Sequence, residues 1–401
     1  MSITVEKAGP EDWAEVIDLG NYVFSHARGP TDFLRVLPKL YKQEYFMDSS
    51  HYIVRENGRI KASVGSYPLK WEFQSGHSIQ GRGVGMVSVH PYARSKGYMN
   101  EALKQALADI KQEGMVFSCL SGDRHRYEYF GYTPVGSTYA FYLYERNIRH
   151  TLGHQWTSKL SLIQVRESDK KILEEIKKMH EAKLARMHRR ADRFFEILYS
   201  YRAQVYAIMD GDKFIGYFIC RDLRTGEHIV IELNMYDYSL LPEAMGLYIR
   251  QTMREPFRIN ANPHEWEKIA ALFGFTETHS IVPAYHFAIF DFKKFTEPFL
   301  HIASKIKKLA DGSFSFLIDD ETSSKLLRVT ISVTGGQPAI DVSAVGDVSA
   351  GSNKELRFNN LDAQYFLFSP MTAETLPAIR ESVFLQSLLP LPLYYENTDG
   401  I

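Results

Sequence analysis

Apolar residues in the first third of the chain follow two spacings, one typical of helices and one of strands. Between Tyr98 and Glu113 they recur every three or four positions, which predicts an amphipathic helix closed by Gly114. A second helix is expected after Pro10 and a short polar one at Asp123–Phe130. Alternating or wholly apolar runs between turn residues predict strands at Ile3–Lys7, His51–Glu56, Ile60–Tyr67, Gly83–Val89, Met115–Leu120 and Thr138–Tyr144.

After the looser segment His150–Lys159 the same order of elements recurs. Strands are predicted at Leu160–Val165, Tyr206–Met209, Phe214–Arg221 and His228–Leu233, and helices at Asp169–Arg189, Pro242–Arg254 and Pro263–Leu272. A tetrapeptide recurs as well, as Phe130-Gly131-Tyr132-Thr133 and then Phe273-Gly274-Phe275-Thr276. Together these features predict two tandem copies of one α/β unit.

From Asp291 onwards the pattern changes. A basic helix is predicted at Phe292–Leu309, followed by strands at Gly312–Ile318, Lys325–Val333 and Ala339–Val345 and by helices near Asn360–Leu367 and Leu376–Leu388. This order predicts a third domain of the α+β class. The chain is therefore expected to combine α/β and α+β folds in three domains, 1–148, 149–290 and 291–401.

The composition fits a globular protein and narrows the classes of partner. Of 401 residues, 45% are apolar and 24% charged, and 47 basic residues against 48 acidic ones leave a net charge of −1. This balance argues against a nucleic-acid or anionic-membrane surface. Two distant cysteines, Cys119 and Cys220, favour a reducing compartment, and no Cys, His and Asp set has metal-ligand spacing. The first residues lack a signal-peptide pattern and no apolar run reaches 18 residues, so a soluble, cytoplasmic protein is expected.

The segment from Val84 to Met99 carries the candidate chemistry. It consists of a strand, a tight basic turn and the start of a helix, where free N–H groups and the helix dipole favour an anion. A diphosphate fits there, with Gly97 allowing close approach and Arg94 and Lys96 adding positive charge. The strand can also pair with an extended amide chain. An ordinary basic strand-to-helix turn is the alternative.

These residues resemble the acetyl-coenzyme A (acetyl-CoA) signature of the GNAT superfamily, whose pyrophosphate loop has Arg or Gln, two residues, Gly, one residue, and Gly or Ala. Arg94 and Gly97 match this pattern, whereas Met99 stands where the last small residue is expected. The resemblance implies acetyl-CoA as cosubstrate. The residues that it implies for binding are Met86, Val87, Ser88, Val89, Arg94, Ser95, Lys96, Gly97, Tyr98, Met99 and Ser121.

The resemblance also implies a proton donor in the segment from Arg126 to Tyr132. Tyr127 would be the general acid that protonates the departing thiolate, because a phenol and a thiol have comparable pKa values. Tyr129 and Tyr132 are competitors for this role, but core or interface packing also explains them, and Tyr127 is favoured. In the second unit Ala270 stands at the equivalent place and no Arg-x-x-Gly turn follows the strand, so that unit is expected to be a non-catalytic scaffold.

Two tandem GNAT units followed by about 110 residues of α+β type resemble the enhanced intracellular survival protein family. The resemblance covers the whole chain. It is specific in Phe24, Gly29-Pro30, Val87 to Gly97, Ser121, Tyr127 and Phe130-Gly131-Tyr132. It implies a sterol-carrier-protein-like third domain, a hexamer, and an amine acceptor such as an aminoglycoside-like polyamine or a protein lysine.

The family resemblance further implies that the general base is the α-carboxylate of Ile401. Glu396 and Asp399 lie in the same tail, so either could replace it or help to form an acidic substrate pocket, and a solvated tail is the alternative. Phe24 and His26 are expected to line that pocket. Family members that modify aminoglycosides have an acidic residue at the position of His26, and they have Trp at that of Val36, so the acceptor stays open.

Two other functions stay open at this stage. A lipid or sterol carrier would use the third domain, although the coenzyme A loop and Tyr127 would have no role in it. A peptidyl transferase that uses aminoacyl-tRNA would also pair two GNAT folds, but the near-neutral charge and the lack of a basic helical arm count against it. The leading prediction is a metal-free N-acetyltransferase.

Overall fold

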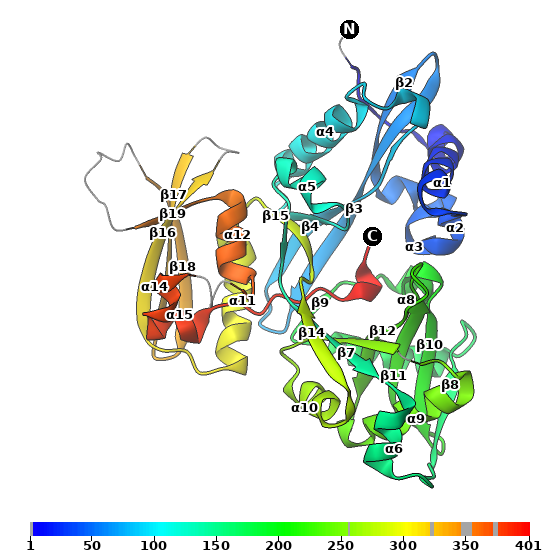
Figure 1. The fold of residues 1–401 in the computed structure, drawn as a ribbon. Helices are drawn as coiled ribbons and strands as arrows, with labels where there is room; N and C mark the ends of the chain where they lie inside the picture. Colours follow the sequence, from blue (N-terminus) through cyan, green and yellow to red (C-terminus); the bar gives the residue numbers. More distant parts are fainter. Residues whose placement is uncertain (1–2, 256, 321–324, 346–354, 372–375) are drawn as a thin grey trace.

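The computed structural model describes residues 3–255, 257–320, 325–345, 355–371 and 376–401, and its strands form three sheets. Figure 1 shows the sheets and their helices as three bodies in contact. The C-terminal segment, drawn in red, leaves the third body and ends between the first and the second. The predicted combination of α/β and α+β folds is confirmed.

The first sheet has the strand order β1-β2-β3-β4-β5-β15-β6, and β9 pairs with β3 as its eighth strand. Its strands are β1 (Glu6–Lys7), β2 (Ser50–Glu56), β3 (Arg59–Phe73), β4 (Ser78–Val89), β5 (Phe117–Leu120), β6 (Thr133–Val135), β9 (Ala185–Met187) and β15 (Tyr285–Ile289). The helices of this region are η1 (Pro10–Asp12), α1 (Trp13–Arg28), α2 (Phe33–Val36), α3 (Pro38–Tyr41), η2 (Gln43–Asp48), η3 (Pro91–Ala93), α4 (Tyr98–Gln112), α5 (Arg124–Tyr127) and η4 (Glu128–Phe130). The helix predicted from Tyr98 is confirmed as α4, whose Leu103, Ala106 and Ile110 are buried on the sheet.

The second sheet has the order β14-β7-β13-β12-β11-β10-β8. Its strands are β7 (Thr138–Leu143), β8 (Leu160–Gln164), β10 (Gln204–Asp210), β11 (Lys213–Asp222), β12 (His228–Met235), β13 (Phe257–Ala261) and β14 (Thr278–Val282). Its helices are α6 (Glu145–Leu152), α7 (Lys170–Glu181), η5 (Ala191–Arg193), α8 (Phe194–Tyr199), η6 (Ser200–Arg202), η7 (Tyr238–Leu240), α9 (Leu241–Thr252) and α10 (Trp266–Phe275). Each of these two sheets has one parallel pair at the equivalent place, β4–β5 and β12–β13. The shared order supports the prediction of two copies of one unit.

The two units exchange a strand. β7 follows β6 along the chain but lies in the second sheet between β13 and β14. In return, β15 follows β14 and lies in the first sheet between β5 and β6. The predicted boundary at 148/149 therefore does not follow the sheets, because each of the first two sheets contains a strand from the other side of it. The boundary at 290/291 does follow them, since the strands of the third sheet all come after it. The two units cannot separate without breaking these strand pairs.

The long charged helix predicted at Asp169–Arg189 is wrong in its second half. α7 ends at Glu181, and β9 pairs antiparallel with the end of β3, where Trp71 lies opposite Met187. Met187 is buried in the same core as Trp71. Residues 185–187 therefore form a strand although the sequence pattern predicts a helix there, because pairing with the end of β3 and burial of Met187 outweigh the local helix propensity.

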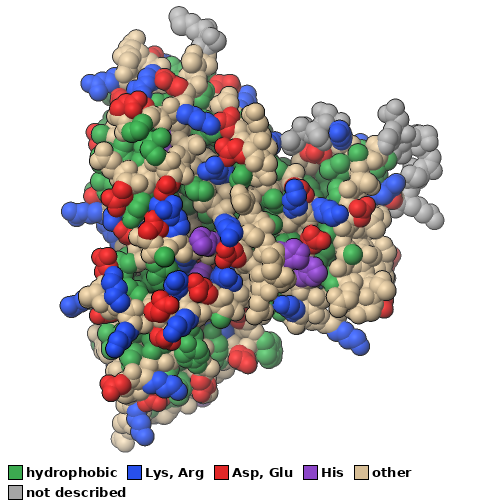
Figure 2. Space-filling model, turned by 180° about the vertical axis from the view of Figure 1, so that it is seen from behind, with side chains coloured by type: hydrophobic (Ala, Val, Ile, Leu, Met, Phe, Trp, Pro, Cys, Tyr) green, Lys and Arg blue, Asp and Glu red, His purple; other side chains and the backbone are tan. Residues whose placement is uncertain are grey.

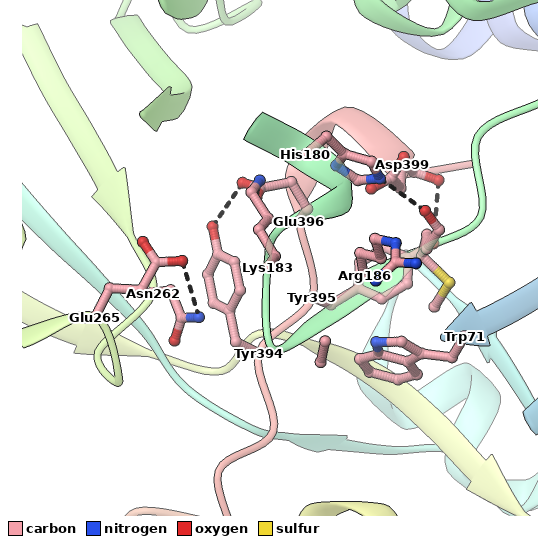
Figure 3. Close-up of a pocket in the computed structure, with 12 residues that line it drawn as sticks. Trp71, His180, Lys183, Arg186, Asn262, Glu265, Tyr394, Tyr395, Glu396 and Asp399 are labelled. Carbon is pink, nitrogen blue, oxygen red and sulfur yellow. Dashed lines mark hydrogen bonds and ion pairs between the residues drawn. The ribbon is translucent and has the colours of Figure 1, made fainter. Parts of the chain in front are cut away.

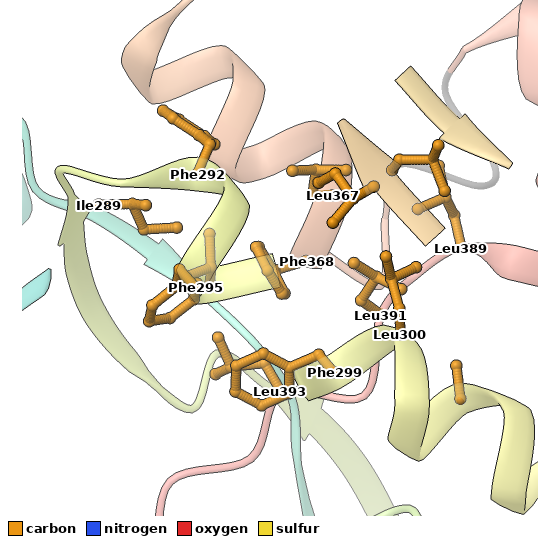
Figure 4. Packing of buried hydrophobic residues seen from close by; sticks show 14 of the residues in the cluster. Ile289, Phe292, Phe295, Phe299, Leu300, Leu367, Phe368, Leu389, Leu391 and Leu393 are labelled. Carbon is orange, nitrogen blue, oxygen red and sulfur yellow. The ribbon is translucent and has the colours of Figure 1, made fainter. Parts of the chain in front are cut away.

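The third sheet has the order β18-β17-β16-β19. Its elements are α11 (Phe292–Ile306), β16 (Gly312–Asp320), β17 (Lys325–Thr334), β18 (Gln337–Val345), β19 (Leu356–Asn359), α12 (Asn360–Phe368), α14 (Pro377–Arg380), α15 (Val383–Leu388) and, in the tail, η8 (Asn397–Asp399). Figure 4 shows Phe295 and Phe299 of α11 beside Phe368 of α12. Phe299 also contacts Trp71 of the first sheet, with ring centroids 5.2 Å apart. One continuous apolar core therefore joins the third body to the first.

Basic and acidic side chains are interspersed over the face of the molecule shown in Figure 2, as the balanced composition predicts. No helix among the described residues is both long and apolar enough to cross a membrane. Within the described ranges, no three His, Cys, Asp or Glu side chains are grouped as a metal ion would require.

Candidate active site

β4 leaves its neighbour β5 partway along its length. The two strands pair only at residues 81–83, whereas β4 stays paired with β3 as far as Val89. Between the pairs Ser63–Ser88 and Gly65–Gly85 β4 has one extra residue, and Met86 in this bulge takes a φ of 46°. Because a bulge bends its strand, β4 beyond Gly83 becomes an edge to which an extended amide chain can add.

The turn between β4 and α4 holds an uncapped helix start. Ser95 and Gly97 take positive φ angles of 64° and 82°, and no side chain of the described residues caps the first turn of α4. Within the described structure, the backbone N–H groups of residues 96–99 donate to no protein group. They are therefore free to bind an anion at the positive end of the helix. A groove of about 590 Å³ lies beside them, with Arg94 in its lining.

Most of the predicted cosubstrate residues face this groove or the cavity next to it, but two do not. The Lys96 ammonium pairs with Glu56 at 2.7 Å, which raises the pKa of Lys96, and its side chain lines neither space. Ser88 is buried on the opposite face of β4, because successive side chains of a strand point to opposite faces. The predicted residues that do line the groove or the cavity are Met86, Val87, Val89, Arg94, Ser95, Gly97, Tyr98, Met99 and Ser121.

The adjoining cavity has a volume of about 750 Å³, and Tyr127 lines it. The Tyr127 side chain is 6% exposed and lies so close to Gly122 that a Cβ there would be 2.4 Å from its Cε2. Tyr129 is 85% exposed, and the buried Tyr132 hydroxyl is hydrogen-bonded to Ser118 at 2.7 Å. Of the three tyrosines, only Tyr127 lines the cavity.

The end of the chain enters the same cavity. Ile401 Cδ1 lies so close to Gly83 that a Cβ there would be 1.6 Å away, and the Ile401 carbonyl carbon is 3.8 Å from the Cβ position of Gly85. The Tyr285 hydroxyl donates to Ile401 O at 3.4 Å. Ile401 and Tyr127, the two predicted catalytic groups, therefore line one cavity together with the bulge of β4.

The tail that leads to Ile401 is packed rather than solvated. Leu393 and Tyr395 are at most 1% exposed. Nearer the end, Lys39 Nζ donates to the backbone carbonyl of Thr398 at 2.9 Å. Apolar and polar contacts thus hold the tail along its length from Leu393 to Thr398.

Glu396 and Asp399 anchor this tail and do not line the cavity of Tyr127. Asp399 accepts from Nε and Nη2 of Arg189 at 2.8 and 3.1 Å, and Glu396 accepts from Lys183 Nζ at 2.7 Å. Figure 3 shows Glu396 and Lys183 at a separate small pocket, which Asp399 also lines. Burial raises the pKa of Glu396. The prediction that either carboxylate shapes the substrate pocket is corrected, because buried cations already pair with both.

Of the two residues predicted for the substrate pocket, only one reaches it. Phe24 lines both the groove and the cavity, and its ring packs edge-on against Phe33 with centroids 5.0 Å apart. His26 is exposed on α1 and lines neither space. The reason is helical geometry, since two positions along a helix turn the side chain by about 200°.

One wall of the cavity comes from the second unit, and the sequence did not indicate it. Tyr201 and Arg202 of η6 line it, together with residues 221–224 at the end of β11. The only signal in the sequence is a short charged run, Arg221-Asp222-Leu223-Arg224, after a predicted strand. The unit predicted to be a scaffold thus completes the candidate site.

Lys39 binds the tail that leads to this site, and the burial of its side chain makes the stability of the fold depend on pH. Its side chain is buried, and this burial lowers its pKa from 10.5 to about 7. Below pH 7 the folded protein carries a buried charge, whereas between pH 7 and 10.5 only the unfolded chain binds the proton, so stability rises with pH in that window. We expect Lys39→Met to stabilise the protein more at pH 6 than at pH 10, by roughly 4 kcal/mol. Urea unfolding at both pH values measures this difference.

The matched control is Lys104→Met, because Lys104 is exposed and paired with Glu101 within α4. Its effect on stability should be small and the same at both pH values. Loss of the hydrogen bond from Lys39 to Thr398 shifts the Lys39→Met result equally at both pH values and leaves their difference intact. An equal effect of Lys39→Met at pH 6 and pH 10 would contradict the lowered pKa.

Comparison with known proteins gives one family match and many similar structures. Residues 4–135 match the model of the acetyltransferase (GNAT) domain family. No curated protein sequence matches the chain. Among solved structures, the chain resembles a conserved protein of unknown function from Enterococcus faecalis V583, described as a probable N-acyltransferase. That match has 16% identity and a TM-score of 0.67, and covers 98% of each chain.

Two further structures match over the whole of both chains. A GCN5-related N-acetyltransferase from Anabaena variabilis ATCC 29413 has 14% identity and a TM-score of 0.66, with 100% of each chain covered. Eis1 from Mycobacterium abscessus has 13% identity and a TM-score of 0.61, again with 100% of each chain covered. At these identities the likeness shows a common fold that extends through all three bodies.

Proposed function

We propose that this chain, an acetyltransferase with a GNAT domain at residues 4–135, transfers the acetyl group of acetyl-CoA to the nitrogen of an amine. One observation carries the proposal: Tyr127 and Ile401 line a single cavity, and this cavity adjoins the groove at the uncapped start of α4. A proton donor, a carboxylate and an anion-binding helix start therefore lie together, and these are the groups that such a transfer uses.

The groove suggests how acetyl-CoA would bind. Its diphosphate would bind the N–H groups at the start of α4, with Arg94 at the rim. The extended amide portion would add to the edge of β4 beyond Gly83 and lead to the cavity of Tyr127. In this arrangement the protein supplies binding and orientation, and acetyl-CoA supplies the activated acetyl group.

We assign the two proton transfers to Tyr127 and Ile401. The Tyr127 hydroxyl would give its proton to the thiolate as the thioester bond breaks. The α-carboxylate of Ile401 would take a proton from the ammonium group of the acceptor, directly or through a water molecule, because a protonated amine cannot attack a thioester. Placing the two groups in one cavity lets both transfers occur around one bound acceptor.

We also propose that the chain is an enhanced intracellular survival protein, with a sterol-carrier-like third domain, a hexameric assembly and a place in the cytoplasm. The support is the match over the whole chain to Eis1 from Mycobacterium abscessus and to two other solved structures covered to 98% or more. The second unit has no Arg-x-x-Gly turn in its sequence. In this proposal its role is to complete the cavity of the first unit.

Binding of acetyl-CoA tests the proposed groove. At a hundred times its Kd, a ligand that binds only the folded state stabilises a protein by about 2.7 kcal/mol, so acetyl-CoA should raise the melting temperature by several degrees. Arg94→Ala should weaken binding by about tenfold, because it removes a charged contact to phosphate. Lys96→Ala is the matched control and should bind normally, since Lys96 pairs with Glu56 outside the groove. An unchanged melting temperature at saturating acetyl-CoA would refute the proposed function.

A further inference from the structure

The wall that the second unit adds to the cavity is rich in arginine. Its charged residues are three arginines and one aspartate: Arg202, Arg221, Arg224 and Asp222. The charge of Asp222 is already balanced, because its Oδ1 pairs with His228 Nδ1 at 2.7 Å and with Arg254 Nη1 at 2.5 Å. The wall therefore presents net positive charge to whatever binds in the cavity.

Of the three arginines of this wall, Arg221 is the one with a buried nitrogen that has no hydrogen-bond partner among the described residues. That nitrogen is Nε. Its guanidinium lies over the ring of Tyr201, 4.5 Å from the centroid, and the charged side chain that acts on it most strongly is a second cation, Arg258. Burial lowers the pKa of Arg221, yet an arginine stays protonated in proteins. A half-buried guanidinium whose Nε lacks a hydrogen-bond partner is costly, and an oxyanion would relieve that cost.

The remaining charges of the cavity do not satisfy Arg221. Asp123 pairs with Arg126 at 3.3 Å on the opposite, first-unit wall. Arg224 Nη2 donates to the Thr31 hydroxyl at 3.0 Å, which fixes the loop after α1. The other negative group of the lining is the C-terminal carboxylate, for which the proposed mechanism already has a use.

The backbone beside Arg221 is held in an uncommon conformation. Tyr201 and Arg202 are consecutive non-glycine residues with φ angles of 61° and 57°. Such residues cost about 1–3 kcal/mol each and persist where the surroundings fix them, often at ligand sites. Here the strained pair places the Tyr201 ring against Arg221 and close to the chain end, where a Cβ on Gly400 would lie 3.8 Å from the Tyr201 hydroxyl.

We propose that the acceptor is a small amine that also carries an oxyanion, a carboxylate or a phosphate, and that Arg221 binds this anion while the amine faces Tyr127 and Ile401. The proposal rests on the proposed acetyltransferase function. It separates this chain from enzymes for purely cationic polyamines, because a polyamine offers Arg221 no partner and adds positive charge to a basic wall.

Matched amines test the proposal in a thiol-release assay with acetyl-CoA. The carboxylate series is the ω-amino acids with three to eight carbons, the phosphate series is the aminoalkyl phosphates of equal length, and the controls are the alkylamines without an anion. We expect kcat/KM to be about 10- to 100-fold higher for an anionic amine at its best length than for the plain amine. A preference for one series identifies the anion as carboxylate or phosphate.

Two arginine variants show whether Arg221 makes this distinction. In Arg221→Met, kcat/KM for the anionic amine should fall at least tenfold more than kcat/KM for the plain amine, and Arg221→Lys should restore part of the loss. Arg250→Met is the matched control, because Arg250 also stacks on an aromatic ring, that of Trp156 at 3.6 Å, but lies outside the cavity. It should keep the preference. Plain amines preferred at every length, or equal losses for both amines in Arg221→Met, would overturn the proposal.

Calorimetry separates this inference from the proposed function. The acetylated products of the two amines, for example 6-acetamidohexanoate and N-hexylacetamide, are titrated into the protein loaded with coenzyme A. Tighter binding of the anionic product, lost in Arg221→Met, supports the anion site even if no amine is acetylated. Equal binding of the two products overturns the anion site even if acetyl transfer is found.

Discussion

Replacing Tyr127 with Phe should lower kcat by about 100- to 10,000-fold, because general acid catalysis by a positioned group contributes that much. Phe keeps the ring but removes the hydroxyl that would protonate the leaving thiolate. The ring makes the packing contacts, an edge-on contact with Tyr132 at 6.3 Å and the close approach to Gly122. Binding of acetyl-CoA and the melting temperature should therefore change little. Thiol release at saturating amine measures kcat, and a melting-temperature shift with acetyl-CoA measures binding.

Tyr129→Phe is the matched control for this prediction. Tyr129 is on the next turn of the same segment but is 85% exposed and lines neither the groove nor the cavity. Its loss should leave kcat within about twofold of the wild-type value. If Tyr127→Phe retained more than a tenth of the wild-type kcat while Tyr129→Phe behaved as expected, Tyr127 would not be the acid.

Gly122→Ala offers an independent route to the same group. A Cβ at this position would lie 2.4 Å from Tyr127 Cε2, so the ring must move although its chemistry is intact.

The importance of Gly122 is not visible in the sequence, because a glycine after a strand has many ordinary explanations. The sequence did indicate Arg94 and Gly97, since a strand, a turn and a helix start lie together over a short stretch of chain, whereas Tyr127 was indicated by the family resemblance.

Features that depend on contacts between distant parts of the chain could not be predicted from the sequence. The exchange of β7 and β15 leaves no local trace, because each strand has the same apolar pattern whichever sheet it joins. The repeated tetrapeptide shows the converse: Gly131 ends η4 with a φ of 86°, whereas Gly274 lies within α10. The two matching glycines thus take different conformations, because η4 ends before Gly131 whereas α10 continues past Gly274.

The tail illustrates how three-dimensional context decides the role of a charged group. Glu396 and Asp399 are as acidic as the chain terminus, so the chemistry of the residues alone does not distinguish the three as a base, and only the family resemblance favoured the Ile401 carboxylate. Buried cations, Lys183 and Arg189, pair with the two side chains and leave the terminus of the tail to enter the cavity. These cations belong to the second unit, more than 200 positions earlier in the chain, where no pattern links them to the tail.

Amidation of the Ile401 carboxylate should lower kcat/KM by about 100-fold or more near pH 7, because the amide cannot accept a proton from the acceptor ammonium. Protein ligation can install the amide, and mass spectrometry shows whether the unmodified protein ends at a free Ile401. Amidation is a sharper test than truncation. Removal of the last residues would take away Asp399 and leave Arg189 buried without that partner, which alone destabilises a protein by about 3–5 kcal/mol.

The pH dependence distinguishes a base from a structural contact. As the pH rises toward the pKa of the amine, more acceptor arrives already deprotonated, so the defect of the amidated protein should shrink steadily between pH 7 and pH 10. Ile401→Val is the matched control: it shortens the side chain that contacts Gly83 but keeps the carboxylate, and it should stay within about threefold of wild type at every pH. Gly83→Ala, whose Cβ would occupy the position of Ile401 Cδ1, should instead displace the chain end and reproduce the pH-dependent defect. An amidated protein with wild-type turnover, or with a defect of the same size at pH 7 and pH 10, would remove the Ile401 carboxylate from the mechanism.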